Sequence, residues 1–139
     1  MEFRYEVTVV PVSDVEAAKQ FYADTLGWSL DTDFAPSDSF RVVQVTPPGS
    51  AASVSFGTGI SAAEPGSYRG MHLVVTDIEA ARDELAGRGV DVTGPFWFGP
   101  EGQTDGLHPQ RQAYGTYLQF GDPDGNVWLV QEVNGRVER

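Results

Sequence analysis

Two stretches of alternating apolar and polar residues, residues 3–10 and 70–75, each stand directly before a helical pattern. The period of two and the β-branched residue types predict strands. After each strand, apolar residues recur at i, i+3 and i+7, which predicts an amphipathic helix. The two helical stripes are Val15, Ala18 and Tyr22, then Ile78, Ala81 and Leu85.

The residues at the start of the two helices form an internal repeat. Residues 12–19 read VSDVEAAK, and residues 75–82 read VTDIEAAR. A hydroxyl residue followed three positions later by Glu predicts a capping box, with Ser13 and Thr76 as the caps. Gly27 and Gly89 are placed to end the helices. One module of about 65 residues is therefore expected twice.

Further strand patterns complete each module. They cover residues 28–33, 40–46 and 51–56 in the first copy, and residues 90–93, 114–120 and 126–133 in the second. The fold class is therefore predicted as α+β, with two βαβββ modules in one domain. Module one spans residues 1–63 and module two residues 68–134, with a linker too short to separate independent domains.

Residues 94–113 form the longest stretch without a clear period. Connections of this length are uncommon in compact domains and are usually functional or disordered. The three adjacent aromatic residues at 96–98 argue against disorder. We therefore expect either a lid over a pocket or a loop that packs its aromatic side chains on a sheet edge.

Composition narrows the function classes. The 139 residues are 40% hydrophobic and 21% charged, as in a globular protein, and cysteine is absent, which excludes thiolate chemistry and disulfides. The net charge of −11 repels a phosphate backbone, so we expect no nucleic-acid partner. The same charge either keeps the surface hydrated or attracts a cationic ligand. No apolar run reaches the roughly 20 residues of a membrane span, and no secretory signal is recognised, so we expect a cytoplasmic protein without a membrane partner.

Three motifs together carry a family resemblance. They are Pro-Val-Ser-Asp at 11–14 leading into Phe21-Tyr22, Leu-Gly-Trp at 26–28, and Asp-Pro-Asp-Gly-Asn at 122–126. With the two modules, they resemble the vicinal oxygen chelate superfamily over residues 3–134. That superfamily includes glyoxalase I, extradiol dioxygenases and bleomycin-resistance proteins. The resemblance implies curled sheets that form a cup with helices outside, and a homodimer.

The metal ligands of that superfamily do not carry over to this chain. Their positions on three strands correspond to Val7, Gly70 and Leu129, and the fourth strand, at 53–56, holds no His, Glu or Gln. A hard divalent ion needs several converging oxygen or imidazole donors. We therefore predict no metal and no cofactor.

The same positions predict which residues line the cup, because side chains alternate along a strand. Val9, His72 and Gln131 would share the faces of the three lost ligands, while Trp128, Val130 and Glu132 would point away. Trp97, His108 and Arg111 would join only if the long loop covers the cup, and the face of Tyr117 stays open. The predicted ligand-binding set is Val7, Val9, Gly70, His72, Trp97, His108, Arg111, Tyr117, Leu129 and Gln131.

The favoured function is a metal-free protein that sequesters a small aromatic or cationic organic molecule, as bleomycin-resistance proteins do. The alternative is an isomerase, lyase or cyclase with His72 as the catalytic acid or base. A metal-dependent lyase or dioxygenase is a third reading. The residues leave open whether His72 catalyses, contacts a ligand or is merely satisfied by its neighbours.

Overall fold

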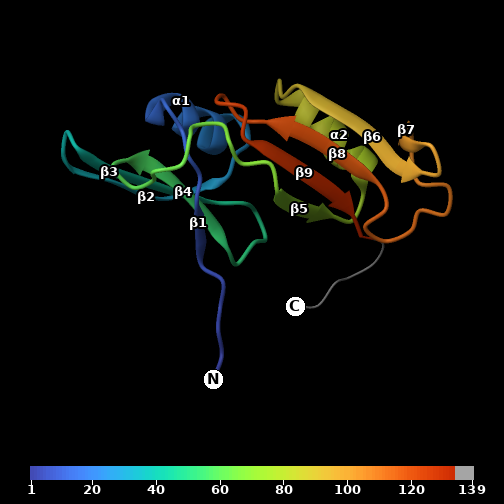
Figure 1. Ribbon diagram of the computed structural model, residues 1–139, viewed down its shortest axis with the longest axis horizontal. Coiled ribbons are helices and arrows are strands. Elements are labelled where there is room, and N and C mark those ends of the chain that lie inside the picture. Colours follow the sequence, from blue (N-terminus) through green and yellow to red (C-terminus); the bar gives the residue numbers. More distant parts are fainter. Residues whose placement is uncertain (134–139) are drawn as a thin grey trace. The chain divides into compact units, whose positions relative to one another are not determined.

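The computed structural model describes residues 1–133 and divides the chain into two compact units. The first unit holds residues 1–68 together with residues 122–126, and the second holds residues 69–121 and the chain from Val127. Residue 134, the expected end of module two, lies outside the described residues. Each unit contains one β-sheet and one helical segment, as Figure 1 shows.

The first unit is a four-stranded sheet in the order β1-β4-β3-β2. Strand β1 runs parallel to β4, and the other pairs are antiparallel. Helix α1 continues without a break into a π-helical turn, η1. The elements are β1 (Val7–Val9), α1 (Val15–Lys19), η1 (Gln20–Thr25), β2 (Ser29–Ser37), β3 (Phe40–Thr46) and β4 (Ser53–Thr58).

The second unit repeats this topology and adds one strand. Its sheet has the order β5-β9-β8-β6-β7, and β5 runs parallel to β9. The elements are β5 (Met71–Val75), α2 (Ile78–Gly87), β6 (Val92–Gly99), β7 (Gly102–Asp105), β8 (Tyr117–Gly121) and β9 (Val127–Glu132). The predicted α+β class is confirmed, and the equal strand order is what two copies of one module would give.

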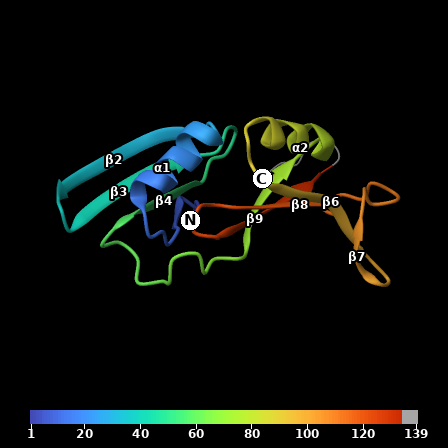
Figure 2. The same cartoon turned by 90° about the horizontal axis from the view of Figure 1, so that it is seen from above.

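One helix covers one face of each sheet (Figure 2). In the first unit the buried side chains of Val43, Val45 and Phe56 lie on the face packed by α1 and η1, where Phe56 stacks on Tyr22. In the second, alternate residues of β8 and β9 are buried with Ile78 of α2. The alternation leaves the opposite face of each sheet without a helix of its own unit.

The predicted helix caps are wrong by one residue. The caps are Asp14 and Asp77, which have extended backbone dihedrals and accept hydrogen bonds from Ala17 N and Ala80 N, each at 3.1 Å. A carboxylate accepts the free N–H as a hydroxyl would. Its negative charge also interacts favourably with the positive end of the helix dipole. Ser13 instead donates to the Asp124 carboxylate at 2.5 Å.

The expected irregular stretch at 94–113 is also corrected. Strand β6 runs to Gly99 and pairs with β8 on one side and with β7 on the other. A register shift between Thr93 and Phe96 interrupts the ladder at Pro95. A proline is tolerated in a sheet at such a bulge. In the sequence alone, however, the same proline predicts a loop.

The turn at residues 122–126 joins β8 to β9, as predicted, but it packs in the first unit. Tyr22 Oη donates to Asp122 Oδ2 at 2.8 Å, and Asn126 Nδ2 donates to the Pro11 carbonyl at 2.8 Å. Gly125 has φ +90°, a conformation that glycine adopts without strain. The motif is therefore a structural element whose Asp122 and Asn126 side chains are buried.

Candidate functional site

The side of the second sheet opposite α2, here called the open face, is the strongest candidate site. Residues paired in register point to the same side of a sheet. Trp128, Val130 and Glu132 are buried on the α2 side, so the alternate residues of β9 belong to the open face. The register across β5, β9, β8 and β6 gives two rows: Val74, Gln131, Tyr117 and Phe96, then His72, Leu129, Gln119 and Thr93.

Three aromatic rings form one end of the open face. Phe96 stacks on Tyr117, with centroids 5.6 Å apart and an interplanar angle of 10°. Phe98, two residues along β6, meets Tyr117 edge-on at 5.3 Å. Phe96 is buried beneath this group, whereas Phe98 is 59% exposed. The cluster therefore presents a preformed aromatic surface to solvent, suited to stacking against a flat molecule.

A hydrogen-bonded pair of polar side chains lies beside the aromatic cluster. His72 Nδ1 is 2.8 Å from Gln131 Oε1, and Gln131 Nε2 donates to the Tyr114 carbonyl at 3.3 Å. Tyr114 is held in turn by its own N–H, which donates to the Glu132 carbonyl at 2.7 Å. The imidazole thus has a fixed neighbour next to the aromatic cluster.

The structure brings four of the sequence-predicted residues together on the open face. They are His72, Tyr117, Leu129 and Gln131. Gly70 directly precedes β5 and is exposed. The face of Tyr117, open in the sequence, follows from its pairing with Gln131. These residues remain predicted ligand contacts, now with a shared surface.

Trp97 and His108 lie elsewhere. Trp97 alternates with Phe96 and Phe98 along β6, so it points to the other side of the sheet, where its ring meets that of His108 at 5.3 Å. His108 Nδ1 accepts the backbone N–H of Gln110 at 3.1 Å. The loop does not bring these two side chains to the open face, and His108 organises the loop instead.

Arg111 is likewise directed away from the open face. Its Nε donates to Glu132 Oε1 at 2.8 Å and its Nη2 to Oε2 at 2.5 Å. The Glu132 side chain is 0% exposed and also accepts the Ile78 N–H, in the first turn of α2, at 3.0 Å. The Arg111 hydrogen bonds lower the pKa of Glu132; burial opposes that shift and the Ile78 N–H adds to it. Arg111 therefore connects the loop to a buried carboxylate, a role that sequence reasoning missed.

Val7 and Val9 belong to the first unit. Their register partners on β4 are Ser53 and Ser55, on the side opposite the buried Val54 and Phe56. Ser53 hydrogen-bonds Thr46 at 2.6 Å, and Thr46 donates to Asp31. By register, Gln44 and the exposed Phe34 lie on this same side of the first sheet, together with Val42.

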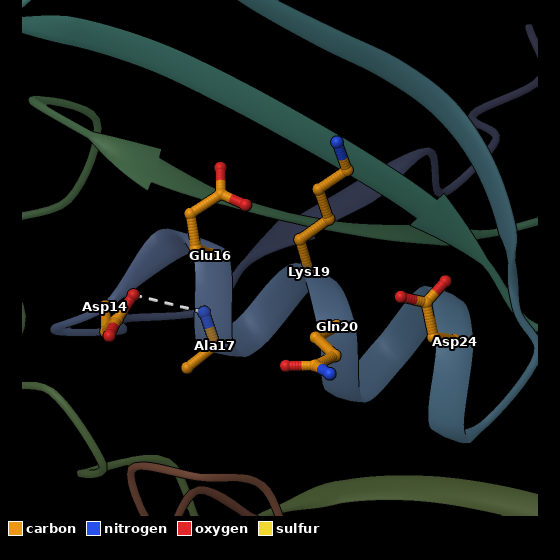
Figure 3. Close-up of a pocket in the computed structure, with 6 residues that line it drawn as sticks. All are labelled: Asp14, Glu16, Ala17, Lys19, Gln20 and Asp24. Atoms are coloured by element: carbon orange, nitrogen blue, oxygen red, sulfur yellow. Dashed lines mark hydrogen bonds between the residues drawn. The ribbon is translucent and has the colours of Figure 1, made fainter.

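A depression beside α1, with a volume of about 470 Å³, is a weaker candidate (Figure 3). Asp14 serves there as the helix cap, and Lys19 bonds Asp33 at 2.8 Å, so both side chains have structural roles. The lining residues are Asp14, Glu16, Ala17, Lys19, Gln20 and Asp24. Such a polar, open surface offers little apolar area for an organic ligand.

Clusters of metal-ligand side chains and membrane-spanning helices are both absent from residues 1–133. No three His, Asp or Glu side chains within this range are grouped as the ligands of a metal ion would be. Nor does the range contain a helix of the length and apolarity that crossing a membrane requires.

Comparison with known proteins places the chain in context. The family model described as Glyoxalase/Bleomycin resistance protein/Dioxygenase superfamily matches residues 4–130. The crystal structure of TnmS3, described as an antibiotic binding protein from Streptomyces sp. CB03234, is 34% identical with a TM-score of 0.75, over 96% of this chain and 98% of that one.

Two other solved structures are similar to the same extent. A glyoxalase/bleomycin resistance protein from Streptomyces sp. CB03234 is 35% identical, with a TM-score of 0.70, over 93% of this chain and 100% of that one. A superfamily member from Sphaerobacter thermophilus DSM 20745 is 32% identical, with a TM-score of 0.71, over 94% and 98% of the two chains.

Proposed function

The chain belongs to the Glyoxalase/Bleomycin resistance protein/Dioxygenase superfamily, and we propose that it is a member that binds and sequesters a small organic molecule without a metal. The ligand lies on the open face, with its flat part against Phe98 and Tyr117 and a polar group toward His72. The observation that carries the proposal is the aromatic cluster beside the His72–Gln131 pair.

The chemistry of the open face matches that of small-molecule sites in general. Such sites are mostly apolar or aromatic, with a few well-placed polar groups that set orientation. Phe98, Tyr117 and Leu129 supply the first kind of surface, and His72 with Gln131 supplies the second. Phe98 and Tyr117 form a contiguous aromatic surface that a flat ligand would cover.

Two other observations support the proposal. TnmS3, at 34% identity over nearly the whole chain, is described as an antibiotic binding protein. In addition, the net charge of −11 attracts cationic molecules to the protein surface and repels anionic ones. The preferred ligand is therefore aromatic and neutral or cationic.

The enzymatic alternative gives His72 the role of acid or base. Its hydrogen-bond partner is an amide. Catalytic histidines are commonly oriented and stabilised in the charged form by a carboxylate, and the nearby carboxylate of Glu132 lies on the opposite side of the sheet. Binding without turnover is therefore the better reading. Full turnover of any identified substrate by His72→Ala would exclude the catalytic role.

Matched variants test the proposed ligand site. A thermal-shift screen of planar aromatic amines and phenols, followed by isothermal titration, identifies a probe. Phe98→Ala is then expected to weaken its binding roughly five- to tenfold, because about 1 kcal/mol of aromatic contact is lost. Leu30→Ala is the control, since Leu30 is also exposed, at 45%, but lies in the first unit in register with buried Val45. Equal affinity of the Phe98 variant and the wild type would contradict the site, and silence across the screen would contradict the function.

A homodimer and a cytoplasmic location complete the proposal. Both remain predictions; the homodimer rests on the family resemblance and not on a contact in the structure. Sedimentation equilibrium of the full chain tests the dimer. A monomer at every concentration, with and without the probe, would exclude it.

A further inference from the structure

The hydrogen bonds around Gln131 determine which of its amide atoms faces His72. The Tyr114 carbonyl can only accept a hydrogen bond, so the Gln131 NH₂ group must point toward it, as it does at 3.3 Å. The other amide atom, Oε1, then faces His72 Nδ1 at 2.8 Å. Amide orientation is normally ambiguous, but here a backbone group settles it.

The oriented amide in turn determines where the imidazole proton lies. Gln131 Oε1 has no hydrogen to give, so His72 Nδ1 must donate. In a neutral imidazole one ring nitrogen donates and the other accepts, and Nε2 is therefore the acceptor. His72 is exposed on the open face, beside its register partner Leu129. The face thus offers one directed acceptor next to an apolar surface.

His108, the other histidine of the chain, is held in the opposite tautomer. Its Nδ1 accepts backbone N–H groups from Gln110 at 3.1 Å and Gln112 at 3.4 Å. A backbone N–H can only donate, so Nδ1 carries no proton and the neutral ring is protonated at Nε2. The protein therefore contains an internal reference for the tautomer of His72.

We propose that the open face selects aromatic ligands bearing a hydrogen-bond donor, a phenolic hydroxyl or a ring N–H, which is received by His72 Nε2. The inference rests on the proposed function and specifies the chemical class of its ligand. A ligand with an ether or carbonyl at the same place would confront one acceptor with another. It would leave the imidazole nitrogen desolvated without a partner, which disfavours binding.

The tautomer is tested first, without any ligand. Protein labelled with ¹⁵N-histidine is studied by NMR at about pH 8, where histidine side chains are mostly neutral. His72→Ala assigns the two rings. The expected result is a protonated Nδ1 and an unprotonated Nε2 for His72, with the reverse for His108. A proton on Nε2 of His72 would overturn the inference.

Ligand selection is tested with 2-naphthol and 2-methoxynaphthalene, which share their rings and differ in the donor. Titration of the wild type is expected to show roughly tenfold tighter binding of 2-naphthol, the scale of one satisfied hydrogen bond. Equal binding of the two probes would overturn this inference and leave the proposed function standing. If neither probe binds, the proposed site fails for planar aromatic ligands, and the inference fails with it.

A variant that adds a negative charge beside His72 tests whether the position of the imidazole proton, and not packing alone, determines ligand selection. In Gln131→Glu a carboxylate replaces the amide and favours the doubly protonated imidazolium, whose Nε2 donates. The preference for 2-naphthol is therefore expected to disappear or reverse. Gln119→Glu adds the same charge to the same face, two strands away in the row of His72 and roughly 10 Å distant. It should keep the wild-type preference, and an equal loss in both variants would contradict the proton-based account.

Discussion

The two units share one topology but differ in how an arginine connects helix and sheet. Glu16 and Glu79 occupy the same position in the sequence repeat, and each lies near an arginine. In the first unit Arg41, on β3, bonds Glu16 at 2.5 Å and Asp33 at 2.8 Å. In the second unit Arg111 comes from a loop and bonds Glu132, whose side chain is 0% exposed.

This difference in burial changes what each arginine contributes. The Asp33 and Glu16 side chains are 24% and 72% exposed, so solvent screens their attraction to Arg41. Glu132 has been taken out of water, and without Arg111 its charge would be nearly uncompensated. A repeated fold therefore does not imply a repeated distribution of stability. The second unit has a fully buried carboxylate that is paired with Arg111, whereas the first spreads its charges over a solvent-facing network.

The largest effect is expected for Arg111→Ala. Leaving the Glu132 carboxylate buried without its counter-ion is expected to lower the unfolding free energy more than the loss of either solvent-facing contact of the first unit. Urea unfolding followed by circular dichroism measures the loss, and hydrogen exchange of the α2 amides localises it to the second unit. The double variant Arg111→Ala, Glu132→Gln should be more stable than Arg111→Ala alone, because no charge stays buried. A double variant that is the less stable of the two would contradict this explanation.

Acid should act through the same carboxylate. Because the Arg111 hydrogen bonds hold the pKa of Glu132 below its ordinary 4.5 in the folded protein, its contribution is complete above that value. It is lost as the pH falls through the folded pKa. The unfolding free energy measured in urea is therefore expected to decline below about pH 4.5. In Glu132→Gln this decline should be shallower, and an unchanged slope would show that other carboxylates carry the acid sensitivity.

A smaller effect is expected for Arg41→Ala in the first unit. The variant loses its bonds to Asp33 and Glu16, but both carboxylates remain accessible to water. We expect a loss of about 1 kcal/mol, the upper range for solvent-facing ion pairs. The same urea experiment compares it directly with Arg111→Ala. A loss as large as that of Arg111→Ala would refute the contrast between the two units.

The open face was predictable wherever strand alternation was sufficient. The pattern on β9 correctly separated Leu129 and Gln131 from the buried Trp128, Val130 and Glu132. Alternation gives the face of a residue only on a strand with a known reference position, so Tyr117 had to await its register with Gln131.

The structural role of Arg111 was beyond sequence reasoning. Arg111 and Glu132 lie 21 positions apart, and no helical or strand period connects such a pair. Moreover, Gly94, Pro95 and Gly99 are residue types that predict a loop, so β6 was not recognised as a strand. Without a strand, the side to which Trp97 points could not be predicted. These are consequences of tertiary packing, which decides between local alternatives that propensity leaves equal.

The smallest effect is expected for Lys19→Met. Lys19 Nζ lies 2.8 Å from Asp33, and the hydrogen bond to this carboxylate raises the pKa of Lys19. The contribution of the contact to stability is therefore fully present below the ordinary pKa of 10.5. It is lost as the pH rises through the folded pKa. At neutral pH the variant should lower the urea midpoint slightly. In about 1 M NaCl, where the Debye length is roughly 3 Å, this difference should vanish. The loss in Arg111→Ala should persist in the same salt, because the buried Glu132 carboxylate is poorly screened. If about 1 M NaCl abolished the loss in Arg111→Ala as fully as the loss in Lys19→Met, Glu132 would have to be as accessible to solvent as Asp33. That outcome would contradict the contrast between the two units.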